Sequence, residues 1–302
     1  MATFYIGPSG DDANDGSYAT PWRNLWYAVA QSGATDTIIV KQGVTVCNSS
    51  HMGNVINLNF RQIIGETGYP ADCVIDGNQL AIWQDAAGDE GSAIQGITFK
   101  NSRTSRNRNY FFMDYSGVVE DCIFEKITVR GDPNDVQGAS GIAFGDTTFR
   151  RCVIKDIACY ASRFTNFFGV RPNLQAPHMR VENCVIVDSG NPPPNSRGSS
   201  AFVFVRQANN PAGSYYRLDF VNTIVLDEAG WANGMYGVFD NPIADSDVTF
   251  DHCCYFGSAF QDPGAVGLTI TDTINANPLF VDAPNGDYRL RPGSPCIGSG
   301  KL

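Results

Sequence analysis

The chain has 302 residues, of which 43% are hydrophobic and 12% aromatic, which allows a sizeable core and excludes a disordered tail. Its net charge of −10 argues against nucleic acid as a partner, because phosphate binding needs a basic surface. The chain opens with no secretory signal and holds no apolar segment of transmembrane length, so we expect no membrane contact and, unless a signal was removed and Met1 added, synthesis in the cytosol.

Residues 1–36 are expected to hold an N-terminal strand and a short capping helix. Thr20 suits the N-cap of this helix, and Pro21 suits its first helical position. Apolar residues then recur at helical spacing along one face, which could cover the open end of a core: Trp22, Leu25, Trp26, Val29 and Ala30.

An aspartate-rich stretch precedes the predicted helix. Asp11, Asp12 and Asp15 lie just before Gly16, as a tight turn requires. The spacing does not fit an EF-hand calcium loop, because the third position of that pattern would fall on Ala13. We therefore favour a turn over a calcium site here.

A degenerate repeat occupies residues 37–272. Seven segments align without gaps: ADCVIDG, IQGITFK, VEDCIFEK, FRRCVIKD, VENCVIVD, FVNTIVLD and FDHCCYFG. Their Cys-equivalent positions are Cys73, Ile97, Cys122, Cys152, Cys184, Thr223 and Cys253, separated by 24, 25, 30, 32, 39 and 30 residues. A short strand at this spacing, with few helical patterns between the copies, is typical of a solenoid with one coil per repeat. We predict an all-β parallel β-helix, a single domain over 1–302 with a closing segment at 273–302.

The nine cysteines fit this fold as core residues. Their odd number, the adjacent Cys253–Cys254 pair and their places in apolar runs indicate buried thiols rather than disulfides. Stacked about 4.8 Å apart in successive coils, small Cys and Thr side chains would form a ladder inside the core. No Cys-x-x-Cys spacing occurs and the histidines are three, so we expect no zinc site: His51, His178 and His252.

Charged side chains flank the ladder positions in columns. Glu120, Arg150, Glu182 and Asp251 lie two residues before a ladder position, and Lys100, Glu125 and Lys155 lie three residues after one. Opposite charges in adjacent coils neutralise one another. These columns therefore predict cross-coil ion pairs on a solvated face, not catalytic groups.

Both ends of the chain resemble a known family. The stretch FYIGPSGDDANDGSYATPWRNLWYAVAQSGATDTIIVKQG is similar to the opening segment of right-handed parallel β-helix proteins of the pectate-lyase-like superfamily. NANPLFVDAPNGDYRLRPGSPCIGSG is similar to their closing segment. With the repeats between, the resemblance covers nearly the whole chain and implies a right-handed parallel β-helix. It is weak for function, because this fold carries lyases, hydrolases, epimerases, phage tailspikes and inert virion or surface proteins.

A column of carboxylates is the candidate catalytic site. Lys126, Asp156, Asp188 and Asp227 lie four residues after successive ladder positions. Carboxylates in consecutive coils repel one another unless a metal, a substrate, a proton or solvent offsets the charge. Separations of roughly 5 to 10 Å would bracket those of retaining and inverting glycosidases. Alternatively, strand-ending aspartates simply cap the turns that follow them.

The family resemblance bears on this column in two ways. It implies that Lys126 could act as a base beside a metal-neutralised uronate, with Ca²⁺ as the cofactor if the protein is lyase-like; otherwise we expect no cofactor and no metal. The motifs of polygalacturonase-like hydrolases of this fold (Asn-x-Asp, Asp-Asp, Gly-His-Gly and Arg-x-Lys) do not occur in the coils, since the Asp-Asp pair is Asp11–Asp12 in the opening turn.

Two long loops, 188–202 and 206–218, are the second candidate site. The first contains three consecutive prolines and is expected to project stiffly from the coils. Aromatic side chains and one arginine in and near the second loop could bind a glycan or another subunit: Arg206, Tyr215, Tyr216, Trp231 and Tyr236.

These features leave two classes of function. The first is a structural, virion-associated bacteriophage protein, of the head-decoration or tailspike-like kind. It would be made in the host cytoplasm, form a homotrimer or bind other virion proteins, and could bind host glycan along its side. The alternative is an extracellular polysaccharide lyase or glycoside hydrolase acting on an extended acidic or neutral glycan. Because the hydrolase motifs and a secretion signal are missing, we place the virion class ahead.

Overall fold

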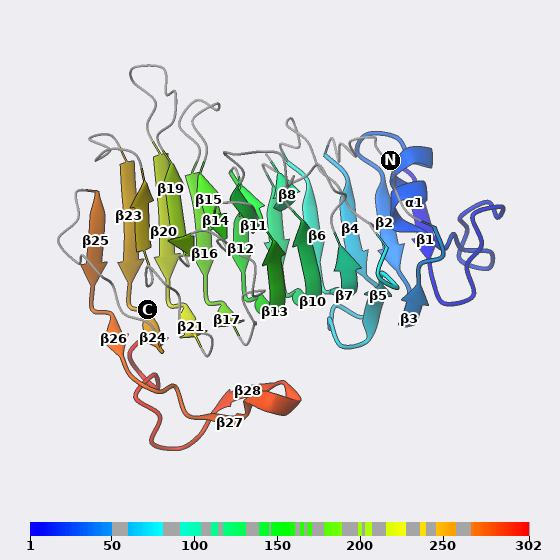
Figure 1. Ribbon diagram of the computed structural model, residues 1–302. Coiled ribbons are helices and arrows are strands. Elements are labelled where there is room, and N and C mark those ends of the chain that lie inside the picture. The colour runs from blue at the N-terminus through cyan, green and yellow to red at the C-terminus, as the bar shows by residue number, and fades with distance from the viewer. Residues whose placement is uncertain are drawn as a thin grey trace.

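Successive repeats form successive coils of a solenoid in the computed structural model, which describes residues 1–49, 60–80, 91–103, 110–113, 117–130, 139–144, 146–160, 164–165, 168–170, 178–188, 199–200, 203–206, 216–227, 236–239, 246–257 and 267–301. At 110–113, 129–130, 139–144, 158–160, 164–165, 168–170, 188, 199–200, 203–206, 216, 236–239 and 246 the description covers the backbone alone. The coils lie side by side along one axis, from β1 and β2 near the N-terminus to β25 (Figure 1). The predicted parallel β-helix is confirmed.

Three parallel sheets form the walls of the solenoid. Sheet A, with ten strands, contains β1 (Thr3–Ile6), β2 (Thr37–Val40), β4 (Gln62–Gly65), β6 (Ala93–Gln95), β9 (Val118–Glu120), β12 (Thr148–Arg150), β16 (His178–Glu182), β20 (Tyr216–Val221), β23 (Ser246–Asp251) and β25 (Leu268–Thr271). Sheet B, with nine strands, contains β3 (Gly43–Val46), β5 (Cys73–Asp76), β7 (Thr98–Arg103), β10 (Ile123–Arg130), β13 (Val153–Tyr160), β17 (Val185–Asp188), β21 (Ile224–Asp227), β24 (Cys254–Phe256) and β26 (Ile274–Asn275).

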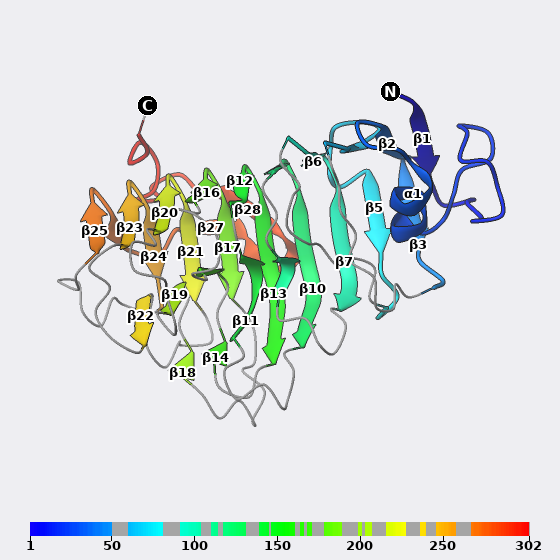
Figure 2. The same ribbon diagram turned by 90° about the horizontal axis from the view of Figure 1, so that it is seen from above.

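The third wall, sheet C, has seven strands: β8 (Tyr110–Met113), β11 (Ala139–Phe144), β14 (Phe164–Thr165), β15 (Phe168–Val170), β18 (Ser199–Ser200), β19 (Val203–Arg206) and β22 (Tyr236–Phe239). Seen along the perpendicular direction, sheets B and C form two distinct sides of the same coils (Figure 2). Sheets A and B thus run along the described length of the solenoid, and the coils from β8 onward add the third wall.

The repeated segment is not one continuous strand, which corrects the prediction. From β6 onward, the strand of sheet A ends two residues before the ladder residue, the next residue adopts the left-handed conformation, and the strand of sheet B begins after the ladder residue. The turning residues have φ between 45° and 54°: Asp121, Arg151, Asn183, Asn222, His252 and Asp272. Asp, Asn and His tolerate this region best among residues other than glycine, which explains the composition of the turn.

The cysteine ladder is confirmed inside the core. Cys73, Cys122, Cys152, Cys184 and Cys253 are free, buried thiols at equivalent levels of successive coils. Each of the last four donates its S–H to a main-chain carbonyl, as Cys152 does to Val119 at 3.3 Å. Thr223 takes the same place, with its hydroxyl on the carbonyl of Val181 at 3.1 Å. Small side chains with one hydrogen-bond donor therefore suit this tight inner corner.

Aromatic rings fill the middle of the core. Phe99, Phe124 and Phe149 are the largest side chains that are fully buried among the described residues. Phe99 stacks on Phe124 with the ring centroids 5.4 Å apart, and Phe124 meets Phe149 edge to face at 6.4 Å. Phe99 and Phe124 are register partners in β7 and β10 of sheet B, so their rings stack, whereas Phe149 meets Phe124 from β12 of sheet A.

The N-terminal helix starts later than predicted. Helix α1 (Leu25–Gln31) has Asn24 as its N-cap and buries Leu25, Ala28 and Val29. Trp22 lies outside the helix, because its backbone is extended and bonds to Tyr5 and Gly7 of the neighbouring chain segment. Thr20 is therefore not the cap and Pro21 is not the first helical residue. Whether α1 shields the end of the core stays a prediction.

The aspartate-rich stretch is a turn, as expected. Asp11 accepts a hydrogen bond from the backbone N–H of Ala13, and Asp15 accepts from Ser17 and from the Thr20 hydroxyl. Those bonds lower the pKa of Asp15 to about 2. Asp12 accepts from the backbone N–H groups just before α1, at Arg23 and Asn24. The carboxylates hold the turn together and tie it to the start of the helix.

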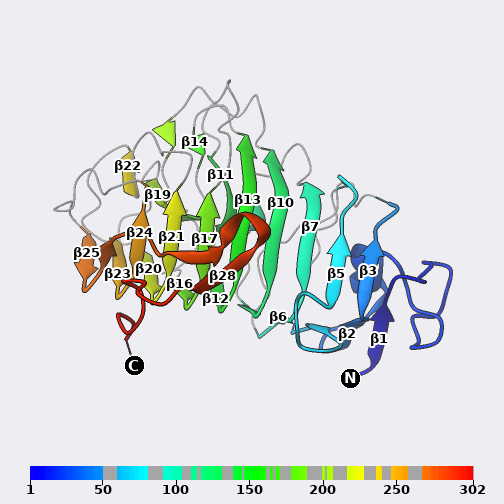
Figure 3. The ribbon, with the colours of Figure 1, turned by 90° about the horizontal axis from the view of Figure 1, so that it is seen from below.

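The closing segment folds back over sheet B. Strands β27 (Phe280–Asp282) and β28 (Asp287–Leu290) form an antiparallel hairpin around the 3-10 helix η1 (Ala283–Asn285). Phe280 of this hairpin packs on Val187 and Leu226, with further apolar contacts from Val185, Ile224, Ala283, Tyr288 and Leu290. Figure 3 shows the hairpin lying across β17 and β21. The outer surface of sheet B is therefore covered at this place.

No helix in the described part of the chain has the length and apolarity that crossing a membrane would require.

Candidate functional site

The predicted carboxylate column keeps its register. Asp188 and Asp227 are direct partners in β17 and β21. Lys126 and Asp156 occupy the same level of β10 and β13, between the pairs Glu125–Lys155 and Ile127–Ile157, and both are left-handed, with φ of 53° and 52°. The stacking that the sequence predicted therefore exists along this line.

The members of this column differ in exposure. Lys126 is exposed, Asp156 is half-buried and Asp227 is 4% exposed. The side chain of Asp188 lies outside the described residues. Asp156 and Asp227 both have interaction partners, and no group of three or more potential metal ligands occurs among the described residues. The catalytic role of the column stays a prediction, and the burial of Asp227 does not favour it.

For Arg206, Tyr216 and Tyr236, three of the candidate binding residues, the structure gives the position of the backbone alone. Arg206 ends β19 and Tyr236 begins β22, so both belong to sheet C, whereas Tyr216 begins β20 of sheet A. Tyr215 and Trp231 lie outside the described residues. Their binding role stays a prediction.

A different cluster lies on the outer face of sheet A. Asp219 in β20 accepts two hydrogen bonds at Oδ2, from Nε2 of His178 at 2.8 Å and from Nε of Arg217 at 2.9 Å. The Asp219 side chain is 6% exposed, whereas that of His178 is 37% exposed and that of Arg217 53%. The carboxylate is thus held beneath an imidazole and a guanidinium that reach the surface.

The strand pattern explains how this cluster forms. Leu218 and Phe220 point into the core, so Asp219 between them points outward by the alternation of a strand. Register then sets His178 opposite Arg217, and Arg180 opposite Asp219. Parallel, in-register strands therefore bring residues about 40 positions apart in the sequence to neighbouring levels of one face.

One oxygen of Asp219 has no partner. Oδ1 is buried and accepts no hydrogen bond, a condition that it shares with only the Thr45 hydroxyl among the described side chains. A buried acceptor without a donor costs about 1–3 kcal/mol, more if charged. Structures tolerate such an atom at sites where a ligand or a reaction uses it. Asp219 is therefore a candidate functional group.

Hydrogen bonding fixes the tautomer of His178. An ionised carboxylate only accepts, so the proton of the neutral ring lies on Nε2, which faces Asp219. Nδ1 then carries a lone pair and is a hydrogen-bond acceptor. The backbone N–H of His178 is held by the Asp146 carboxylate. The ring is thus held at Nε2 by Asp219, and the main chain of the same residue is held by Asp146.

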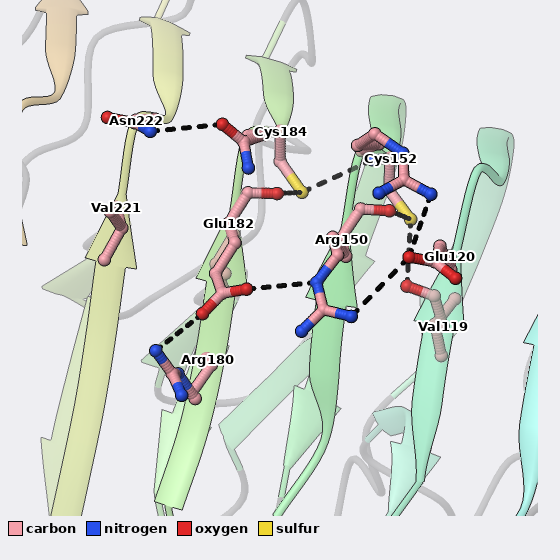
Figure 4. A network of polar contacts seen from close by, with 12 residues as sticks. Val119, Glu120, Arg150, Cys152, Arg180, Glu182, Cys184, Val221 and Asn222 are labelled. Atoms are coloured by element: carbon pink, nitrogen blue, oxygen red, sulfur yellow. Dashed lines mark hydrogen bonds and ion pairs between the residues drawn. The ribbon is translucent and has the colours of Figure 1, made fainter. Parts of the chain in front are cut away.

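Ion pairs continue this surface toward the N-terminal coils (Figure 4). Arg180 contacts Glu182 at 2.7 Å, Glu182 contacts Arg150 at 3.1 Å, and Arg150 reaches Glu120 at 3.6 Å. The predicted cross-coil ion pairs are thereby confirmed on sheet A. On sheet B, Lys155 pairs with Glu125 at 3.0 Å as predicted, and Lys100 approaches Asp76 at 3.8 Å.

The sequence held a signal for the missed cluster. The columns of charged residues predicted from the sequence began two residues before each ladder position and did not include earlier positions. Six residues before it stand Asp146, His178, Arg217 and Asp247, and four residues before it stand Arg180 and Asp219. Extending the columns would have placed a histidine between charged neighbours, although not the burial of Asp219.

Comparisons with known proteins give solved structures of similar architecture. No family model matches the chain, and no curated protein matches it. Pectate lyase Pel9A is 13% identical over 100% of this chain and 92% of its own, with a TM-score of 0.42. A rhamnogalacturonan lyase is 10% identical over 91% and 74%, with a TM-score of 0.40. A pectin methylesterase in complex with a hexasaccharide is 13% identical over 90% and 89%, with a TM-score of 0.36. Likeness at this level carries no argument about activity.

Proposed function

We propose that this protein acts on an extended acidic polysaccharide that lies against the outer face of sheet A. The observation that carries the proposal is the His178–Asp219 pair, a half-exposed imidazole on a buried carboxylate whose second oxygen is unpartnered. Buried polar atoms left without a partner are found at sites where a ligand or a reaction uses them. His178 is the proton acceptor in this proposal, and Asp219 orients it.

The charges around the pair favour an acidic substrate. Arg217 and Arg180 flank Asp219 with 53% and 45% of their side chains exposed. A guanidinium binds a carboxylate with two parallel hydrogen bonds, so either residue suits a uronate. Since strands repeat about every 4.8 Å, the same face offers further levels to neighbouring sugars.

These groups suit β-elimination, the reaction of a polysaccharide lyase. Nδ1 of His178 takes the proton from the carbon next to the uronate carboxylate, and arginine offsets the charge that develops there. The electron pair of that C–H bond forms the new double bond, and the glycosidic C–O bond breaks. The leaving oxygen takes a proton, which imidazolium can return. One histidine serves both steps, whereas glycoside hydrolysis needs two carboxyl groups.

The test is turnover on a panel of acidic and neutral glycans, read by near-ultraviolet absorbance of the unsaturated product and by reducing ends. We expect His178→Gln to abolish the absorbance. His252→Gln is the matched control, because His252 also pairs with an aspartate, Asp251 at 2.7 Å, but in the turn between sheets A and B. Wild-type protein that cleaves no glycan, or equal losses in both variants, would refute the proposal.

The virion-associated role is the second candidate. Its support is the cysteine ladder, because free buried thiols suit folding in a reducing cytosol. A trimer or a complex with other virion proteins would go with this role, as would binding of host glycan without cleavage. Mass spectrometry of purified phage particles and light scattering of the isolated protein would test both points. Absence of the chain from such particles would remove this candidate.

A further inference from the structure

Two thiols meet where the closing segment returns to the coils. The Cys254 thiol in β24 donates to the carbonyl of Ala276 at 3.2 Å. Close by, the Ser294 hydroxyl donates to the carbonyl of Pro278 at 2.6 Å and accepts from the backbone N–H of Cys296 at 3.2 Å. The backbone of residues 276–278 therefore lies against Cys254 and Ser294, and the Cys296 thiol is close enough to Cys254 for each thiol to shift the pKa of the other.

This pair differs from the cysteine ladder. Cys253, the neighbour of Cys254, belongs to the main core, whereas Cys254 points to the other side of sheet B, beneath the closing segment. Cys296 is half-buried rather than buried, so small reagents can reach it. Interaction with the neighbouring Cys254 thiol lowers the pKa of the Cys296 thiol, whereas interaction with Cys296 and burial raise the pKa of Cys254. Cys296 is the more accessible of the two thiols and the one whose pKa is lowered, so it is the nucleophile of the pair.

We propose that Cys254 and Cys296 form a dithiol–disulfide site that a low-molecular-weight disulfide, such as glutathione disulfide, oxidises. The Cys296 thiolate attacks one sulfur of the small disulfide, and the other sulfur leaves as a thiol after taking up a proton. Cys254 then loses its proton and attacks the Cys296 sulfur, which releases the second small thiol. The protein loses two electrons and two protons, and the small disulfide is reduced to two thiols.

Oxidation would fasten the closing segment to the coils. In the reduced chain, the hairpin β27–β28 is held on sheet B by apolar contacts around Phe280, Val187 and Leu226 and by the tail, where Lys301 bonds to Asp251 at 2.7 Å and to Asn222. A covalent bond at Cys296 would limit how far this segment can detach. The site is independent of the proposed chemistry on sheet A, which lies on another wall.

The experiment treats the folded full-length chain with glutathione disulfide, blocks remaining thiols, and maps the peptides by mass spectrometry. We expect the loss of two reactive thiols per chain and a cross-linked peptide joining Cys254 to Cys296, with Cys253 alkylated only after unfolding. Hydrogen exchange across 280–290 should slow on oxidation of the wild type and stay unchanged in Cys296→Ser, whose half-buried position preserves the fold.

Two results would overturn the proposal. In one, both cysteines stay alkylatable after oxidation. In the other, Cys296 keeps a stable glutathione adduct while Cys254 remains a free thiol, which shows that the second thiol cannot resolve the first. Unchanged hydrogen exchange despite a mapped cross-link would overturn the fastening of the closing segment.

Discussion

Asp219→Asn separates a catalytic role for the His178–Asp219 pair from a structural one. The amide keeps the shape of the side chain but removes the charge. In the wild type, Oδ2 of Asp219 accepts two charge-assisted hydrogen bonds, from His178 at 2.8 Å and from Arg217 at 2.9 Å. A charged hydrogen bond contributes about 1.5–3 kcal/mol and a neutral one about 0.5–1.5 kcal/mol, so two weakened bonds cost about 2 kcal/mol. The variant also no longer buries a charge, which offsets part of that loss. We expect a folded protein.

Turnover should fall much further than stability. An amide that donates to Nε2 would force the wrong tautomer on His178, and loss of the charge destabilises the imidazolium. Comparable changes lower kcat by about 10²- to 10⁴-fold. The assays are urea denaturation and turnover on the best glycan of the panel. Asp121→Asn is the control, because Asp121 also holds two guanidinium bonds, from Arg151, but in the turn away from the proposed site. Asp219→Asn with wild-type turnover would refute the mechanism.

Two further predictions concern the fold. In a urea titration, Phe124→Ala should lower the free energy of unfolding by about 3–5 kcal/mol, because it removes the ring that contacts both Phe99 and Phe149. The control is Ile297→Ala, which should change the free energy of unfolding little because Ile297 is exposed. The hydrogen bond from Arg151 lowers the pKa of Asp121 in the folded chain. The ionised carboxylate therefore stabilises the fold at every pH above the unfolded pKa of about 4. This contribution is lost as the pH falls through the lower pKa of the folded state. Stability measured against pH should therefore fall less steeply in acid for Arg151→Ala; an unchanged slope would contradict the pairing.

The repeat predicted the core because a parallel solenoid turns sequence periodicity directly into spatial neighbours. Once Cys122, Cys152 and Cys184 were aligned, the ladder, the ion pairs around Arg150 and the in-register column at Asp227 all followed. Each needed only the alternation of strands and a constant distance between coils. Local reasoning failed where tertiary contacts compete with propensity. Thr20 and Pro21 look like the start of a helix, but a backbone pairing with Tyr5 keeps Trp22 extended.

The sequence by itself determined the fold class, the buried thiols and the order of charged columns, because each depends on periodic positions. The tertiary structure alone decided which charges are buried and what covers each wall. Asp219 and Asp227 are both strand aspartates in the sequence. In the structure, however, Asp219 on sheet A is hydrogen-bonded to the imidazole of His178 and has one oxygen without a partner. The closing hairpin covers one face of sheet B through Phe280, and its return brings Cys296 to Cys254. Burial and long-range meetings of this kind depend on how loops and tails return to the coils, and no repeat pattern encodes that.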